Sequence, residues 1–236
     1  MDHRSIREAL VDRSGGKLDE SKAIQKEKDA FAAGKKGGGD VNATDFIRFG
    51  GGRGLPSYFE SSPKALLVKE GLRFSERVYM RTRDAAILKK DFTFDVLLSP
   101  DWEGGSLNKT LYIGVGTGLG GGQRNPYNVP VDSAFISIQP PSVNEGEVVV
   151  ANSPEFGKGD KIGHIREKGN HMVRVEKKGE TVTFSICTNY DGKFNPDITH
   201  TVSNLRDYVP ALTDKNTHIF LGGAGTYKQV RLVYGR

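Results

Sequence analysis

Short runs of β-branched and aromatic residues, separated by turn-forming residues, restrict the fold of this chain more than any other feature. From about residue 45 onward these runs are bounded by Gly, Pro, Asn and Asp, as in Phe92–Leu98 and His171–Glu176. Strands that follow one another without crossover helices must pair antiparallel. Each run has one apolar face, and two such faces bury each other in a sandwich. The sequence therefore predicts an all-β protein made of two antiparallel sheets.

The N-terminal part of the chain has a different character. Residues 1–40 lack strand patterning, and Ser21–Phe31 is rich in good helix formers. Gly34–Gly39 would end a helix there and act as a spacer. The whole length of 236 residues suits one large β domain. We therefore expect a short helical or flexible segment or linker at 1–40, followed by the β-sandwich at 41–236.

The charge pattern narrows the range of partners. The chain carries a formal net charge of +5, but residues 1–40 hold nine cations and eight anions, which leaves +1. A balanced segment binds phosphates poorly, so we expect no nucleic-acid partner. No apolar run approaches the ~20 residues that cross a bilayer, and the start of the chain has no apolar signal core. We therefore expect neither a membrane span nor a secretory signal.

Three segments resemble a known superfamily. Gly169–Ile186, with a turn at Lys178-Gly179, resembles a hairpin common to concanavalin A-like and laminin G-like sandwiches. His218–Gly223 and Gln229–Tyr234 are similar to their closing strands. The resemblance covers roughly residues 60 to 236 and implies a concanavalin A-like jelly roll. That superfamily includes lectins, other glycan-binding modules, glycoside hydrolases and polysaccharide lyases, as well as structural proteins. It also slightly favours an extracellular or cell-surface location.

Aromatic residues in predicted loops are the first candidates for ligand contacts. Trp102, Tyr127 and Tyr190 lie in polar turn segments, and Asn195 accompanies the last of them. An exposed aromatic ring can stack on the C–H face of a sugar while a nearby amide bonds its hydroxyl groups. This pattern predicts a loop-borne glycan surface. The alternative is that Trp102 closes the end of the core.

The segment Asn189–Asp197 also carries candidate metal ligands. Asp191, Asn195 and Asp197 offer oxygen ligands at short spacing, which Ca²⁺ prefers. The spacing differs from that of an EF-hand loop, and turns rich in Asp and Asn also form without metal. The sequence therefore leaves two interpretations of this segment open, a calcium site and an ordinary turn without metal.

An enzymatic alternative depends on three residues. Gly225-Thr-Tyr227-Lys-Gln229 resembles part of an alginate-lyase motif, with Tyr227 as acid or base and Arg81 and Gln139 in support. Pro140-Pro141 stand where that family has Ile-His, so the motif is incomplete. We also expect His164, His171, His200 and His218, which stand apart in the sequence, to be structural or exposed.

These observations lead to one main interpretation and two alternatives. The main interpretation is a non-catalytic glycan-binding or extracellular interaction module whose glycan partner is neutral or acidic. The first alternative is a polysaccharide lyase acting on a uronate-containing polymer. The second is a structural protein that oligomerises through residues 1–40.

Overall fold

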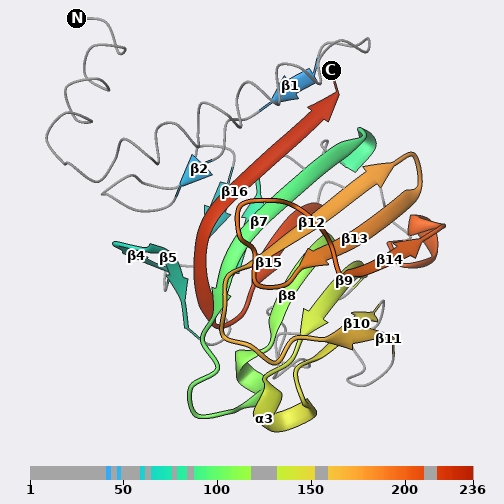
Figure 1. Ribbon diagram of the computed structural model, residues 1–236. Coiled ribbons are helices and arrows are strands. Elements are labelled where there is room, and N and C mark those ends of the chain that lie inside the picture. Colours follow the sequence, from blue (N-terminus) through green and yellow to red (C-terminus); the bar gives the residue numbers. More distant parts are fainter. Residues whose placement is uncertain are drawn as a thin grey trace, which may run out of the picture. The chain divides into compact units, whose positions relative to one another are not determined.

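A computed structural model places the body of the chain in two packed sheets (Figure 1). The predicted N-terminal segment 1–40 and Tyr127 lie outside the described residues, so the domain boundary at 40/41 stays a prediction. The structure describes residues 41–43, 47–48, 59–61, 65–75, 79–83, 88–117, 132–151, 159–209 and 217–235.

Sheet A is the nine-stranded sheet in front in Figure 1, and every neighbouring pair in it is antiparallel. β1 (Val41–Ala43) and β2 (Ile47–Arg48) both pair with β16 beside the main path. In order across the sheet, the main path runs through β14 (Ile198–Val202), β13 (Thr181–Cys187), β12 (His171–Lys178), β7 (Phe92–Pro100), β16 (Gly225–Gly235), β5 (Gly71–Phe74) and β4 (Leu66–Val68).

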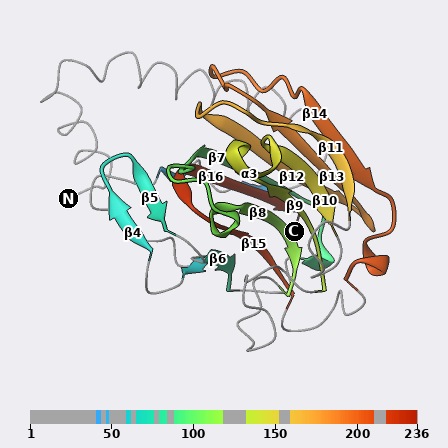
Figure 2. The same cartoon turned by 90° about the horizontal axis from the view of Figure 1, so that it is seen from below.

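Sheet B is seven-stranded, also antiparallel, and lies behind sheet A. At one edge of the sandwich, β11 of this sheet lies beside β14 of sheet A (Figure 2). Its strands are β11 (Asp160–His164), β10 (Glu147–Ala151), β9 (Ser133–Ile138), β8 (Leu111–Gly116), β15 (His218–Gly222), β6 (Tyr79–Thr82) and β3 (Phe59–Ser61).

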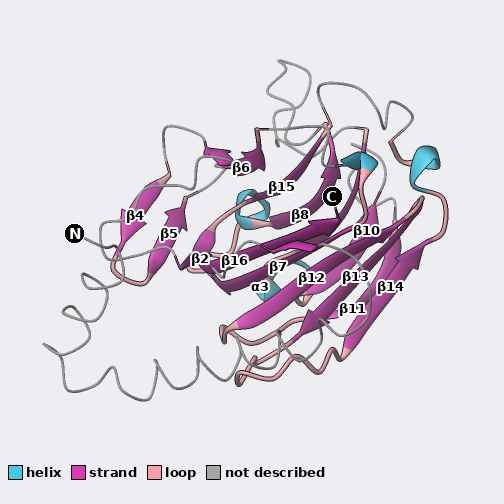
Figure 3. Cartoon of the chain, turned by 90° about the horizontal axis from the view of Figure 1, so that it is seen from above, coloured by secondary structure: helices cyan, strands magenta, loops and turns pink. Residues whose placement is uncertain are grey.

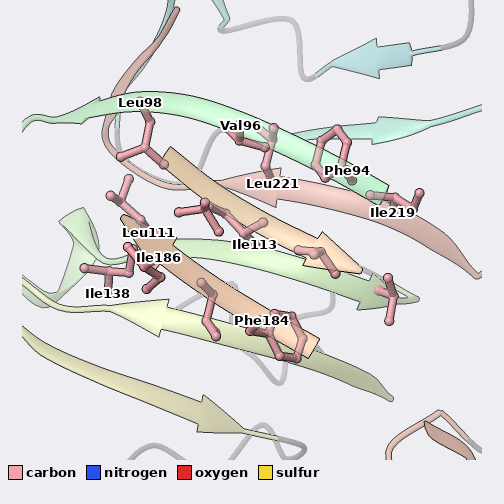
Figure 4. Close-up of a cluster of buried hydrophobic side chains, with 14 of the residues drawn as sticks. Phe94, Val96, Leu98, Leu111, Ile113, Ile138, Phe184, Ile186, Ile219 and Leu221 are labelled. Atoms are coloured by element: carbon pink, nitrogen blue, oxygen red, sulfur yellow. The ribbon is translucent and has the colours of Figure 1, made fainter. Parts of the chain in front are cut away.

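The alternation of side chains along β7 separates the core from the outer face of sheet A. Phe94, Val96 and Leu98 point toward sheet B and are fully buried (Figure 4). Asp95 and Leu97, between them in sequence, lie on the opposite face, because successive strand residues alternate. The predicted two-sheet antiparallel sandwich is therefore confirmed.

Turns and short helices connect the strands. The predicted hairpin turns at Gly179-Glu180, where Gly179 has a φ of +57°, and its amide donates to Asp91 Oδ1 at 2.7 Å. Asn204 caps the 3₁₀ turn η3 (Leu205–Asp207). Helices in the described ranges are limited to η3, η2 (Leu107–Lys109), α3 (Pro141–Asn144) and a 3₁₀ turn beginning at Leu88 (Figure 3). None of these is long and apolar enough to cross a membrane.

Leucine truncations test this assignment of the core. Leu98→Ala removes a fully buried side chain and should lower the free energy of unfolding by about 2–5 kcal/mol. The same change at Leu66, which is 60% exposed on β4, should cost less than about 0.5 kcal/mol. Urea unfolding monitored by circular dichroism measures both. Equal losses at the two positions would contradict the assignment.

Candidate functional site

A polar hollow of about 430 Å³ opens where the chain passes from sheet B to sheet A. The crossing segment follows β11 and leads into β12, and a second connection leaves the end of β13. The lining residues come from these two connections and from the adjoining ends of β11 and β12: His164, Ile165, Arg166, Glu167, His171, Thr188 and Asn189.

Backbone contacts hold the two connections together. The amide of Tyr190 donates to the carbonyl of Asn170 at 2.7 Å. Asn189 has a φ of +50°, a left-handed conformation that Asn adopts more readily than most residues. At Gly169, a Cβ atom would lie 2.3 Å from Asn189 Oδ1, so any larger residue would displace the Asn189 side chain. The amide of Asn189 is thereby placed at the wall of the hollow.

His171 organises the floor of the hollow. The Asn189 backbone N–H can only donate, so it identifies His171 Nδ1, 3.3 Å away, as the acceptor. The proton therefore sits on Nε2, which donates to the carbonyl of Glu167 at 3.0 Å. Burial lowers the pKa of His171, because the charged imidazolium would lose its hydration. His171 is thus a buried, neutral structural residue, in line with the structural role expected for it.

Groups with complementary hydrogen-bonding roles surround this floor. The side chain of Asn189 donates to the carboxylate of Glu167, which fixes both groups. Arg166 is exposed and pairs with Glu145 on the other side, with Nη2 and Oε2 2.8 Å apart. The wall therefore presents a guanidinium, a carboxylate and an amide within one small opening. Such a set can donate to and accept from neighbouring hydroxyl groups of one ligand.

The predicted aromatic Tyr190 lies on the outer face of sheet A. With Phe194 it packs on a small apolar cluster made of Leu97, Met172 and Cys187. Asn189, the residue before Tyr190, lines the hollow instead. The loop that follows β13 therefore contributes residues to two surfaces, the hollow and the outer face of sheet A.

The predicted calcium ligands mainly brace their own loop. Asp191 Oδ1 accepts from the amide of Lys193 at 3.0 Å. Asp197 accepts from the amide of Thr188 at 2.9 Å and also from its hydroxyl group. Asn195 is exposed. Across the described ranges, no three His, Cys, Asp or Glu side chains gather to hold a metal ion. The geometry is that of a hydrogen-bonded turn, the alternative left open by the sequence.

The structure corrects the prediction for Trp102. Its side chain is 5% exposed and belongs to the main core, so neither ring face is open to a sugar. The loop that carries it is drawn inward, because the amide of Asp101 donates to Ala224 at 3.1 Å. Trp102 closes one end of the core, and it is left out of the candidate site.

The lyase residues are not brought together. Tyr227 is fully buried in sheet A and its hydroxyl donates to the carbonyl of Gly222 at 2.6 Å. Burial also raises the pKa of Tyr227, which opposes a role as a base. Arg81 lies on β6 of sheet B, and Gln139 is buried after β9 and accepts from Asn144. The prediction of a catalytic Tyr227 is therefore wrong for this fold.

Sequence reasoning missed most of the hollow. Arg166, Glu167 and Thr188 belong to no recognisable motif, and they meet only because two connections converge. Of these lining residues, only Asn189 lies in a segment for which the sequence predicted candidate ligands, Asn189–Asp197.

His171 makes the stability of this region depend on pH. Its folded pKa lies below its ordinary value of 6.5, so the unfolded state binds the proton more tightly. The stabilisation is complete above pH 6.5 and should fall as the pH drops below that value, until the folded pKa is reached. Urea unfolding at about pH 7.5 and about pH 5.5 should show a smaller loss for His171→Gln than for wild type. Asn195→Ala, on an exposed residue that does not titrate, is the control and should keep the wild-type loss. An unchanged loss in His171→Gln would contradict the assignment.

No protein-family profile matches the sequence, and the search of curated proteins finds no match. Solved structures do match. Peanut lectin is 10% identical, with a TM-score of 0.54 over 83% of this chain and 97% of the other. Basic winged bean lectin is 9% identical, with a TM-score of 0.54 over 83% and 99%. The exoplasmic/lumenal domain of VIP36 is 10% identical, with a TM-score of 0.51 over 78% and 86%.

At these identities the likeness concerns the arrangement of the strands. It agrees with the order and the antiparallel pairing of the two sheets described above. The chain has the concanavalin A-like β-sandwich fold.

Proposed function

We propose that this protein is a non-catalytic glycan-binding module and that the hollow beside His171 and Asn189 is its sugar site. The observation that carries the proposal is the lining of the hollow by Arg166, Glu167 and Asn189, of which Glu167 and Asn189 are hydrogen-bonded to each other. Its volume of about 430 Å³ is in the range of ligand pockets, roughly 300–1,000 Å³.

The chemistry of sugars matches this lining. Each hydroxyl group of a sugar donates one hydrogen bond and accepts others, so recognition needs donors and acceptors side by side. Glu167 accepts, Arg166 donates, and Asn189 does both. The bond from Asn189 to Glu167 holds both groups before a ligand arrives, which reduces the ordering cost of binding.

The structural neighbours support the same class of ligand. The winged bean structure contains the Tn-antigen, and the VIP36 structure is a Ca²⁺/Man-bound form. Fold alone does not determine function. These neighbours therefore support the class of ligand, and the lining of the hollow is the argument for the position of the site.

The VIP36 structure contains Ca²⁺, which raises the question whether the predicted ligands of this chain suit that ion. In this chain the carboxylates of Asp191 and Asp197 already accept hydrogen bonds from their own loop. We therefore propose that sugar binding depends on the side chains of the hollow and proceeds without metal.

Two asparagine variants test the proposed site. Asn189→Gly keeps the left-handed backbone without strain and removes only the amide side chain. Loss of its hydrogen bonds should weaken binding of a glycan found on an array by about tenfold. Asn195→Ala changes an exposed amide in the same loop, outside the hollow, and should bind like wild type. Titration calorimetry in EDTA and in calcium should give the same affinity.

Three results would count against this proposal. Loss of binding in Asn195→Ala with normal binding in Asn189→Gly would move the site to the tip of the loop. Loss of wild-type binding in EDTA would show that a metal takes part. Failure of the wild-type protein to bind any glycan on the array would overturn the function itself.

A further inference from the structure

A second hollow, of about 290 Å³, lies at the far end of β12 from the hollow beside His171. A rise of about 3.3 Å per residue puts roughly 20 Å of strand between His171 and Lys177. The two hollows are therefore separate, and the second is called the Lys177 hollow below. Its lining includes Asp91, Thr93, Glu176, Lys177, Lys178 and Tyr234.

Lys177 occupies a strand position that otherwise carries apolar side chains. Val173 and Val175 of β12 are fully buried in the main core, and Lys177 is the next residue in the same alternation. It lies opposite Phe92 in the pairing register and is only 3% exposed. Lysine is almost never buried to this extent unless its charge is paired.

The protein pairs this ammonium group incompletely. An ammonium can donate three hydrogen bonds, and Lys177 Nζ donates one, to the carbonyl of Lys90 at 3.2 Å. Within the part of the chain that the structure describes, no carboxylate forms an ion pair with Lys177. Burial lowers the pKa of Lys177, because the charged form loses its hydration. A negatively charged acceptor in the hollow would offset the cost of burying this charge.

The carboxylates that line the Lys177 hollow are engaged elsewhere. Glu176 Oε1 lies 2.6 Å from Lys178 Nζ. Asp91 Oδ1 accepts from the amide of Gly179 at 2.7 Å. Each carboxylate retains lone pairs that can accept from hydroxyl groups, and the hydroxyl of Thr93 can donate or accept. The lining therefore combines one cation that lacks an ion pair with several groups that suit the hydroxyls of a ligand.

We infer that the Lys177 hollow binds a sugar acid, with the ligand carboxylate on the ammonium of Lys177 and its hydroxyl groups on Glu176, Asp91 and Thr93. For the class of ligand the inference rests on the proposed glycan-binding function, to which it adds a second site and an acidic group. The volume lies just below the roughly 300–1,000 Å³ of most ligand pockets, which suits a single sugar ring. A neutral sugar would leave the ammonium without a counter-charge.

Nuclear magnetic resonance titration tests the inference, because the amides of each hollow report on it separately. Galacturonate should shift the amides of residues 91–93 and 176–178. Galactose has the same ring hydroxyl groups but no carboxylate, and it should bind there about tenfold more weakly, the loss of one charge-assisted hydrogen bond. Sulfate, an anion without ring hydroxyls, should also bind there more weakly than galacturonate.

Three variants locate the contact. Lys177→Met removes the charge and keeps the approximate size of the side chain, a change that is often neutral or stabilising at a buried charge. It should weaken galacturonate binding at residues 176–178 by about tenfold. Lys69→Met removes an exposed ammonium that lines neither hollow and should change this affinity less than about twofold. Asn189→Gly, in the hollow beside His171, should leave it unchanged.

Several results would overturn the inference. One is normal galacturonate binding at residues 176–178 in Lys177→Met, shown to be folded by its melting curve. Others are binding of galactose or sulfate at these residues as tightly as galacturonate, or the absence of shifts there in wild type.

The proposed function and this inference fail separately. An array glycan that shifts residues 188–189, with no effect of galacturonate on residues 176–178, would overturn only the inference. Galacturonate binding at residues 176–178, with no glycan binding at residues 188–189, would overturn the sugar site beside His171 and support the Lys177 hollow.

Discussion

Mutual burial of two apolar sheet faces is the interaction on which this structure depends. Strand β7 lies in the middle of sheet A and contributes Phe94, Val96 and Leu98 to the interior. Burial of such side chains contributes about 1.5–3 kcal/mol each. The strict alternation that this burial requires also fixes which residues face outward. The core therefore determines the position of Asp95 as firmly as that of its neighbours.

The position of the proposed sugar site is a consequence of that constraint. The hollow forms where the chain must leave sheet B and enter sheet A, and its polar lining satisfies backbone groups that no strand can pair. Arg231, Asp95 and Arg174 lie in one row on the face of sheet A that the core does not use. The hydrogen bond from Asn189 to Glu167 places these two side chains before a ligand arrives, which reduces the ordering cost of binding.

The sequence was sufficient to predict the fold because strand alternation is a local pattern. The hairpin of β12 and β13 was placed almost to the residue, since Gly179 marks its turn. The direction of a loop side chain is not local, and Trp102 turned out to be buried because hydrogen bonding draws its loop against the core. The hollow combines Glu167 and Asn189, which are distant in sequence and lie in connections that leave strands of different sheets. No spacing rule predicts such a meeting.

The central claim, that the hollow binds sugar, is tested most directly by nuclear magnetic resonance during titration with a glycan identified on an array. The account predicts that the largest amide shifts fall in the segments 164–171 and 188–189, with smaller shifts elsewhere in sheets A and B. Shifts concentrated around Trp102, or spread over the chain without a maximum at the hollow, would contradict it.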